Sequence, residues 1–198
     1  MTVTVLNETF DNASLFSTSI SFFSDGAQDF LGISDGAGGG LFGSGAAPSA
    51  VKAYTGFNGN FLTGMDLDGE GATLPVTILW ELDISGLSNL SFSGDFAEFF
   101  DDPGDIDADD FIHVEYQIDG GGFQPLLLFE GADFVTTANG VFREDTNGDG
   151  EGDGTALGDA AQTFTKAIAG SGTDLDLRLS VRLDAGDEDF AVDHVVVT

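Results

Sequence analysis

The chain of 198 residues contains no cysteine. This absence excludes disulfide bonds, catalysis by a thiol and zinc sites built from Cys ligands. If the protein is exported, it must be stabilised by packing and bound metal, since covalent cross-links are not available to it. Proline is also scarce, with 4 residues, and neither a Pro-rich linker nor an internal repeat divides the sequence. We therefore expect a single domain over residues 1–198.

Positive charge is scarce as well. Five Lys and Arg stand against 35 Asp and Glu, which gives a formal net charge of −30. A field this negative repels the phosphates of nucleic acids and anionic lipids, so it excludes direct binding to either without bridging cations. No apolar run approaches the length that crosses a bilayer, and we expect no membrane insertion. The first residues lack a basic region followed by an apolar run, so no signal peptide is predicted.

The acidic side chains that are present are mostly Asp, with 26 Asp against 9 Glu. Asp is a poor helix former, a frequent turn residue and a ligand of hard cations. This ratio predicts acid-rich loops and argues against a helical protein. A halophilic or marine source is an alternative cause of the acidity, and it does not exclude calcium.

Apolar and polar residues alternate with a period of two along the chain. In residues 174–183, five apolar side chains occupy every second position, and residues 75–84 repeat the pattern. Such alternation is typical of a half-buried antiparallel strand. The other candidate strands are 2–6, 17–23, 29–34, 51–54, 60–65, 90–93, 111–118, 124–129, 162–168 and 190–197. So many strands, with a long Gly-rich loop at 35–48 and no strong helical segment, predict an all-β sandwich.

One acidic segment has the spacing of a calcium loop. Oxygen-bearing side chains alternate with glycines, and Gly150 falls at the sixth position, where an EF-hand loop bends sharply. Ala156 occupies the twelfth position in place of the bidentate Glu, so we predict a calcium loop without the helices of an EF-hand. The alternative is a flexible acidic hairpin loop that binds nothing. The candidate ligands are Asp145, Asn147, Asp149, Glu151 and Asp153.

Two further acidic clusters are candidate cation sites. Dense carboxylates repel one another, so they either bind cations or remain solvated, and a solvated loop is the alternative for each cluster. The first cluster contains Asp101, Asp102, Asp105, Asp107, Asp109 and Asp110, and the second contains Asp66, Asp68 and Glu70.

Motifs for catalysis are missing. The sequence contains no G-x-S-x-G, Walker or H-E-x-x-H motif. Its two histidines, His113 and His194, fall in predicted strands, where we expect them to be structural. Pairs of carboxyl groups hydrolyse glycosides in other proteins, but 35 acids make any one pair uninformative. We therefore expect no enzymatic activity.

A stretch of aromatic and amide side chains is the candidate ligand-binding surface. Rings next to amides suit contacts with sugars or peptides. The alternative is core packing of the rings with Asn in turns, and for Phe61 we favour that interpretation. The candidate ligand-binding residues are Tyr54, Phe57, Asn58 and Asn60.

Acids also lie near both ends of the chain. Glu8 and Asp11 follow the first predicted strand, and Asp193 lies in the last one. Because terminal strands of a sandwich often neighbour one another, a hard cation that joins Glu8 or Asp11 to Asp193 would hold both ends. The alternative is a turn-forming Asp-Asn pair near the first strand and a surface Asp in the last.

Short motifs along the chain resemble those of extracellular bacterial calcium-binding jelly-roll modules. Such modules occur in repeats-in-toxin adhesins as ligand-binding domains, beside secreted nucleases, and among carbohydrate-binding modules. The motifs are Glu8-Thr9-Phe10-Asp11, the strand from Trp80 to Ile84, the hairpin from Tyr116 to Gly121, and the closing segment from Phe190 to Val195.

The resemblance implies a two-sheet antiparallel jelly-roll β-sandwich with long acidic, Gly-rich loops and structural calcium. In similar modules an acid after the first strand and an Asp in the last strand share one ion, and these positions correspond to Glu8 or Asp11 and to Asp193. An Asn usually follows that Asp, whereas this chain has His194.

From this resemblance we expect a non-catalytic, Ca²⁺-dependent module of a bacterial adhesin or exoprotein, excised from a larger exported protein. We expect a monomer at the cell surface or outside the cell that recognises cell-surface carbohydrate or peptide and binds no nucleic acid. A structural spacer and an accessory domain of a secreted hydrolase are the alternatives.

Overall fold

The computed structural model describes residues 3–12, 15–100, 105–131 and 140–198. These residues form two antiparallel sheets and no helix, so the fold is an all-β two-sheet sandwich, as the sequence predicts. One sheet contains β1 (Leu6–Glu8), β3 (Phe23–Ser24), β4 (Phe30–Ser34), β5 (Gly40–Leu41), β6 (Phe61–Met65), β8 (Ser91–Ala97), β12 (Gln162–Ala167) and β14 (Asp189–Val197). The other contains β2 (Ser17–Thr18), β7 (Val76–Asp83), β9 (Phe111–Ile118), β10 (Gln124–Glu130), β11 (Arg143–Glu144) and β13 (Asp174–Arg182).

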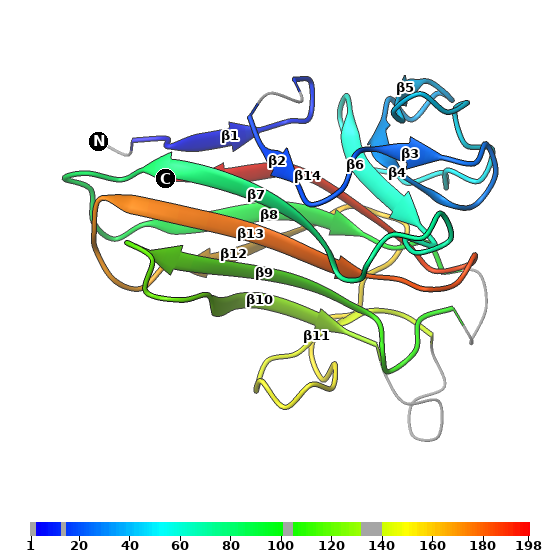
Figure 1. Ribbon diagram of the computed structural model, residues 1–198. Coiled ribbons are helices and arrows are strands. Elements are labelled where there is room, and N and C mark those ends of the chain that lie inside the picture. The colour runs from blue at the N-terminus through cyan, green and yellow to red at the C-terminus, as the bar shows by residue number, and fades with distance from the viewer. Residues whose placement is uncertain (1–2, 13–14, 101–104, 132–139) are drawn as a thin grey trace.

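The two sheets stack as layers, with β13 near the middle of one and β14 near the middle of the other (Figure 1). The six-stranded sheet has the order β11-β10-β9-β13-β7-β2, and the larger sheet follows the order β12-β8-β14-β6-β4-β3. β14 pairs with β8 along one edge. Its other edge pairs first with β6 and then, near the C-terminal end, with β1. The last strand is therefore held on both sides.

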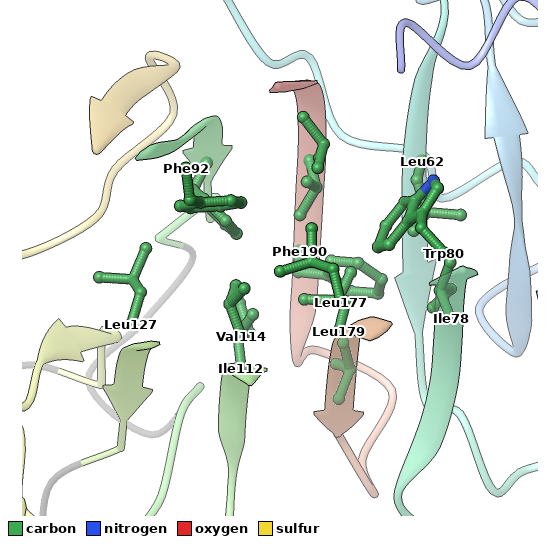
Figure 2. Close-up of a cluster of buried hydrophobic side chains, with 14 of the residues drawn as sticks. Leu62, Ile78, Trp80, Phe92, Ile112, Val114, Leu127, Leu177, Leu179 and Phe190 are labelled. Carbon is green, nitrogen blue, oxygen red and sulfur yellow. The ribbon is translucent and has the colours of Figure 1, made fainter. Parts of the chain in front are cut away.

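Alternating side chains of both sheets fill the space between the layers (Figure 2). Leu177 on β13 lies opposite Trp80 on β7, and both are buried. The facing sheet contributes Phe92 and Phe190 to the same cluster. Full burial of one such side chain contributes about 1.5–3 kcal/mol to stability. The alternation of apolar and polar residues places these side chains on the inner faces of the two sheets, where they form the core.

Several sequence-based boundaries need correction. The predicted strand 17–23 is two short strands, β2 and β3, which belong to different sheets. Residues 51–54 form no strand, and Thr55 makes only an isolated bridge with Ala160. The first strand begins at Leu6, where residues 2–6 were predicted. The Gly-rich segment 35–48 contains the short strand β5, which pairs with β4. Gly32 on β4 permits this pairing because it has no side chain. A Cβ there would lie 2.4 Å from the ring of Phe42, which follows β5.

Within the part of the chain that the structure describes, no helix is long and apolar enough to cross a membrane.

Candidate cation and ligand sites

The first and last strands lie side by side, and their pairing gathers acids from both ends of the chain. β1 places Glu8 opposite Val195 on β14, and β14 places Asp193 opposite Asp95 on β8. Burial is the largest cause of the raised pKa of Glu8 and of the pKa of about 6 for Asp193, and the negative charge of Asp11 contributes to both shifts. We call Glu8, Asp11, Asp95 and Asp193 the terminal acid cluster.

Asp193 is fully buried, and neither of its carboxylate oxygens receives a hydrogen bond from the described residues. The imidazole Nδ1 of His194 lies 3.1 Å from Asp193 Oδ2 and 3.2 Å from Asp95 Oδ2. Glu8 is also fully buried, but its Oε1 accepts the N–H of Phe10 at 2.6 Å. Because burying an ionised oxygen without a partner is costly, the cluster has the chemistry of a cation site.

The backbone of β14 is irregular beside this cluster. The register with β8 shifts between Asp193 and Val196, and His194 has a left-handed φ of 48°. Asn, Asp and His are the non-glycine residues that adopt this region most readily. His194 is therefore a residue type that suits this irregular backbone, and bulges re-aim neighbouring side chains.

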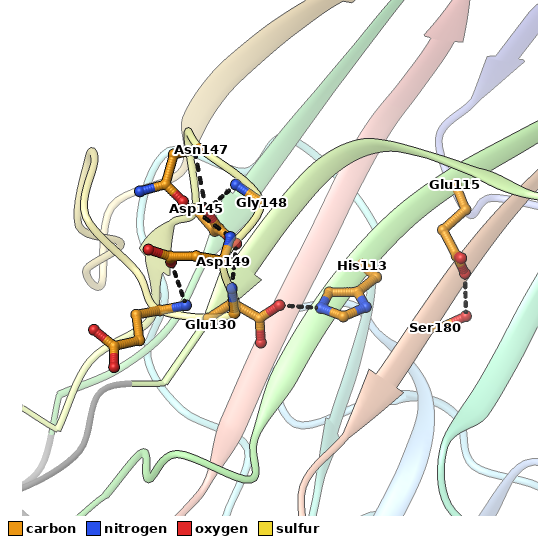
Figure 3. A network of polar contacts seen from close by, with 10 residues as sticks. His113, Glu115, Glu130, Asp145, Asn147, Gly148, Asp149 and Ser180 are labelled. Carbon is orange, nitrogen blue, oxygen red and sulfur yellow. Dashed lines mark hydrogen bonds and ion pairs between the residues drawn. The ribbon is translucent and has the colours of Figure 1, made fainter.

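The segment 145–153 folds into a tight loop around its first Asp (Figure 3). Asp145 accepts the N–H groups of Asn147 and Gly148 through Oδ1, at 3.1 and 2.6 Å, and that of Gly150 through Oδ2 at 2.9 Å. Partial burial works to raise the pKa of Asp145, but these donors outweigh it and hold the pKa below its usual value. The Asp145 carboxylate is therefore ionised at neutral pH.

The remaining candidates of this loop continue the same pattern. Asn147 Oδ1 accepts the N–H of Asp149, and Asp149 Oδ1 accepts the N–H of Glu151. Asp153 closes the loop, because its Oδ1 accepts the N–H of Thr146 at 2.9 Å and this bond lowers its pKa. Asp145 Oδ1 and Asp153 Oδ1 each accept two hydrogen bonds, whereas Asp145 Oδ2 and Asp149 Oδ1 each accept one and keep a lone pair for an ion.

The acids at 105–110 do not share one face. Asp105 and Asp110 are buried, Asp107 is half-buried, and Asp109 is exposed. Asp107 accepts the N–H of Asp109, as expected in a turn. Asp101 and Asp102 lie outside the described residues.

The segment 66–70 lies close to Asp29, an acid that was not among the candidates from the sequence. Burial, followed by the negative charges of Asp29 and Asp68, raises the pKa of Asp66 to about 6. A Cβ at Gly69 would meet the Asp29 carboxyl carbon at 2.4 Å, so the glycine permits this approach. Glu70 is exposed at the edge of the segment.

The predicted ligand-binding stretch forms a cluster of aromatic rings. The ring centroids of Phe57 and Phe61 lie 4.9 Å apart in a stacked arrangement, and Tyr54 packs edge-on against both. The cluster rests on Ala97 and Ala191, away from the core between the sheets, because Ala191 alternates with the core residues of β14. Asn58 is exposed beside the rings, and Asn60 is half-buried.

Two buried acids beneath this cluster were missed at the sequence level. The hydroxyl of Tyr54 donates to Asp189, which also accepts the N–H of Phe99 at 3.0 Å. Glu98 is 1 % exposed, and neither of its carboxylate oxygens has a hydrogen-bond partner among the described residues. Burial, followed by the negative charge of Asp189, raises the pKa of Glu98 to about 9. The position of Glu98 among the aromatic side chains of residues 96–100 is the sequence feature that could have identified it as a buried acid.

His113 lies on the outer face of the six-stranded sheet. Its Nε2 lies 2.6 Å from Oε1 of Glu130, and its ring stacks on Phe111 with centroids 4.1 Å apart (Figure 3). On the same sheet Glu115 accepts hydrogen bonds from Arg178 and Ser180. These contacts give His113 Nε2 and Glu115 Oε2 partners within the sheet.

No family model matches the sequence, and no curated protein matches it. Among solved structures, the K1 cleaved adhesin domain of Lys-gingipain from Porphyromonas gingivalis superposes with a TM-score of 0.53 at 14% identity, covering 99% of this chain and 98% of that one. The K2 adhesin domain of Lys-gingipain gives 0.50 at 11% identity, with 98% and 97% covered. A family 11 carbohydrate-binding module from Clostridium thermocellum gives 0.42 at 8% identity, with 100% and 96% covered. At these identities, the two adhesin domains establish that this chain has their β-sandwich fold.

Proposed function

We propose that this chain is a non-catalytic, calcium-dependent binding module of a bacterial adhesin or other exported protein. It acts as a monomer outside the cell and recognises carbohydrate or peptide on a cell surface. The observation that carries the proposal is the fully buried carboxylate of Asp193 within the terminal acid cluster, which accepts no hydrogen bond from the described residues. The fold shared with adhesin domains of Lys-gingipain agrees with such a role.

Calcium suits the terminal acid cluster because its ligands are hard oxygens. Glu8, Asp11 and Asp193 would hold the ion, and backbone carbonyls and water would complete a coordination of six to eight oxygens. The ion would neutralise acids that burial has deprived of solvent, and it would fasten the three-residue strand β1 to β14. Metal binding of this kind adds directly to folding stability.

The loop 145–153 is the second proposed calcium site. Its first Asp is ionised, its backbone is curled, and Gly148 and Gly150 adopt φ values of 77° and 86° that ordinary side chains rarely adopt. The ligands would be Asp145, Asn147, Asp149 and Asp153, with Glu151 at the position that contributes a backbone oxygen in EF-hand loops.

The ligand surface in this proposal is the outer face above Ala97 and Ala191. Tyr54 and Phe57 offer partly exposed rings, and Asn58 offers an exposed amide. A flat aromatic edge beside an amide suits a sugar ring or a peptide, since both present apolar patches flanked by hydrogen-bonding groups.

Thermal unfolding across a Ca²⁺ titration, with EDTA as the baseline, tests the proposal. A rise in Tm that is specific to Ca²⁺ is expected, because an ion that binds the folded state stabilises it by mass action. Mg²⁺ at the same concentration and high NaCl serve as controls. An equal rise in NaCl would mean that the acids form only a screened surface, and the calcium dependence would be rejected.

Glycan and peptide arrays test the second half of the proposal. Binding in Ca²⁺ that disappears in EDTA and weakens in Phe57→Ala supports a calcium-dependent ligand site on this face. Saccharide turnover by the wild-type protein would instead identify a hydrolase. Calcium binding without any ligand on either array would identify a spacer module.

A further inference from the structure

A group of acids at the far end of the sandwich from the termini comes from two separate loops. Asp110 precedes β9, whereas Asp184 and Glu188 lie in the turn between β13 and β14. β13 pairs with β9 so that Arg182 lies opposite Phe111, and this register places the turn beside Asp110. One oxygen from each of the three carboxyl groups lies within 4.8 Å of the others.

Two of these acids are buried, and one oxygen is left without a partner. Asp110 is fully buried, and its Oδ1 receives no hydrogen bond from the described residues, whereas its Oδ2 accepts the N–H of Asp107 at 2.8 Å. Glu188 is 3 % exposed, and its Oε2 accepts the N–H groups of Asp184 and Ala185. A buried, ionised oxygen is expensive to leave unpaired, so the group requires either a cation or a bound proton.

The neighbouring arginine is directed to the outer acids. Arg182 donates to Oδ2 of Asp184 at 2.9 Å, and it lies 3.8 Å from Oδ2 of Asp109. Among the described residues, no Lys, Arg or His side chain is hydrogen-bonded to Asp110 Oδ1. Asp184 itself is exposed, so the group opens to solvent on that side and an ion has a route of entry.

We propose that a calcium ion binds between Asp110, Asp184 and Glu188 and fastens the β13–β14 turn to the start of β9. The three carboxyl groups supply only hard oxygen ligands, and neither nitrogen nor sulfur ligands that favour zinc are among them. Backbone carbonyls and water would complete the shell. The site lies apart from the terminal acid cluster and from the loop 145–153, so it can fail while the proposed function stands.

Native mass spectrometry with added CaCl₂ counts the bound ions and tests the site. Asp184→Asn keeps the shape of an exposed side chain but weakens it as a ligand, and we expect it to bind one ion fewer than the wild type at the same CaCl₂ concentration. Asp187→Asn is the matched control, because it removes the same charge from the same turn but lies outside the group of three. It should keep every ion.

Each outcome separates this site from the proposed function. If Asp193→Asn loses an ion and Asp184→Asn does not, the group holds a proton, this inference is overturned, and the proposed function stands. If the wild type binds no calcium at all, both are overturned. A crystal grown with Tb³⁺ gives a direct check that does not depend on any variant, since an anomalous peak must lie between the three carboxyl groups. Terbium peaks elsewhere and none here would reject the site.

Discussion

Asp193 on β14 lies directly opposite Asp95 on β8, although like charges at opposed positions of an antiparallel pair repel each other. Asp193 is fully buried, and the imidazole of His194 lies within 3.2 Å of Oδ2 of both carboxylates. The repulsion between Asp95 and Asp193 therefore destabilises the folded protein unless a positive charge lies between the two carboxylates. This relationship gives the sharpest test of calcium binding.

Asp193→Asn should remove a calcium-dependent part of the stability while sparing the calcium-free protein. At 100 times the Kd, one site contributes about 2.7 kcal/mol. For a domain of this size that corresponds to a change in Tm of about 5–10 °C. In EDTA the variant should match or exceed the wild type, because it no longer buries a carboxylate that accepts no hydrogen bond. Differential scanning calorimetry with and without Ca²⁺ measures both, and equal losses in the two conditions would indicate a packing role.

Asp149→Asn should lower calcium affinity and thermal stability together. The amide oxygen of the new side chain can still accept the N–H of Glu151, so the loop keeps its shape and loses only a charge. Isothermal titration calorimetry should record weaker binding at one site. Thr146→Ser is the matched control within the loop, because it retains the hydroxyl that donates to Asp153. An unchanged titration for Asp149→Asn would reject the loop 145–153 as a calcium site and show that its own hydrogen bonds are sufficient to hold it.

Stability in EDTA should depend on pH through Glu98. Its pKa is about 9 in the folded protein and near 4.5 in the unfolded chain, so the folded state binds the proton more tightly. The contribution of protonated Glu98 to the free energy of unfolding is fully present below about pH 4.5 and is lost as the pH rises towards 9. Glu98→Gln keeps the neutral form at every pH. Urea unfolding of this variant should therefore show a flatter fall in stability between pH 5 and 9, and a slope equal to that of the wild type would count against a buried, protonated Glu98.

Asn58→Ala should weaken ligand binding without affecting the fold. The side chain is exposed, and loss of one hydrogen bond of about 1 kcal/mol lowers affinity by about fivefold. Asn7→Ala is the control, since Asn7 is an exposed amide on β1, far along the chain from the aromatic stretch. Surface plasmon resonance against the glycan or peptide identified on the arrays compares the two. Equal affinities for both variants would show that Asn58 does not contact the ligand and that the ligand site lies elsewhere on the protein.

Much of the framework follows from local pattern. The alternation in residues 174–183 predicts β13 and its buried face, because a period of two sets which side chains lie inward. Residues 51–54 also contain apolar side chains, but they pair with no strand of the described chain and form no strand themselves. Local pattern identifies candidates for strands, whereas pairing decides which of them form.

The candidate sites divide in the same way. The loop 145–153 is visible in the sequence because all its candidate ligands are neighbours along the chain. The group of Asp110, Asp184 and Glu188 is not, because it exists only through the register of β13 against β9. Glu98 was missed for a different reason. Its burial depends on how the ends of β8 and β14 meet, and an acid after a strand is ordinarily solvated.

The pairing of β1 with β14 has a mechanical consequence. Leu6 begins β1 opposite Val197, which ends β14, so the two strands open to the outside at the same end of their shared ladder (Figure 1). A pull applied to both ends of the chain would load these hydrogen bonds one after another, as in unzipping, and not all at once. Glu8 stands at the inner end of this short ladder, beside the terminal acid cluster. An ion held there would act as the stop at which the unzipping halts.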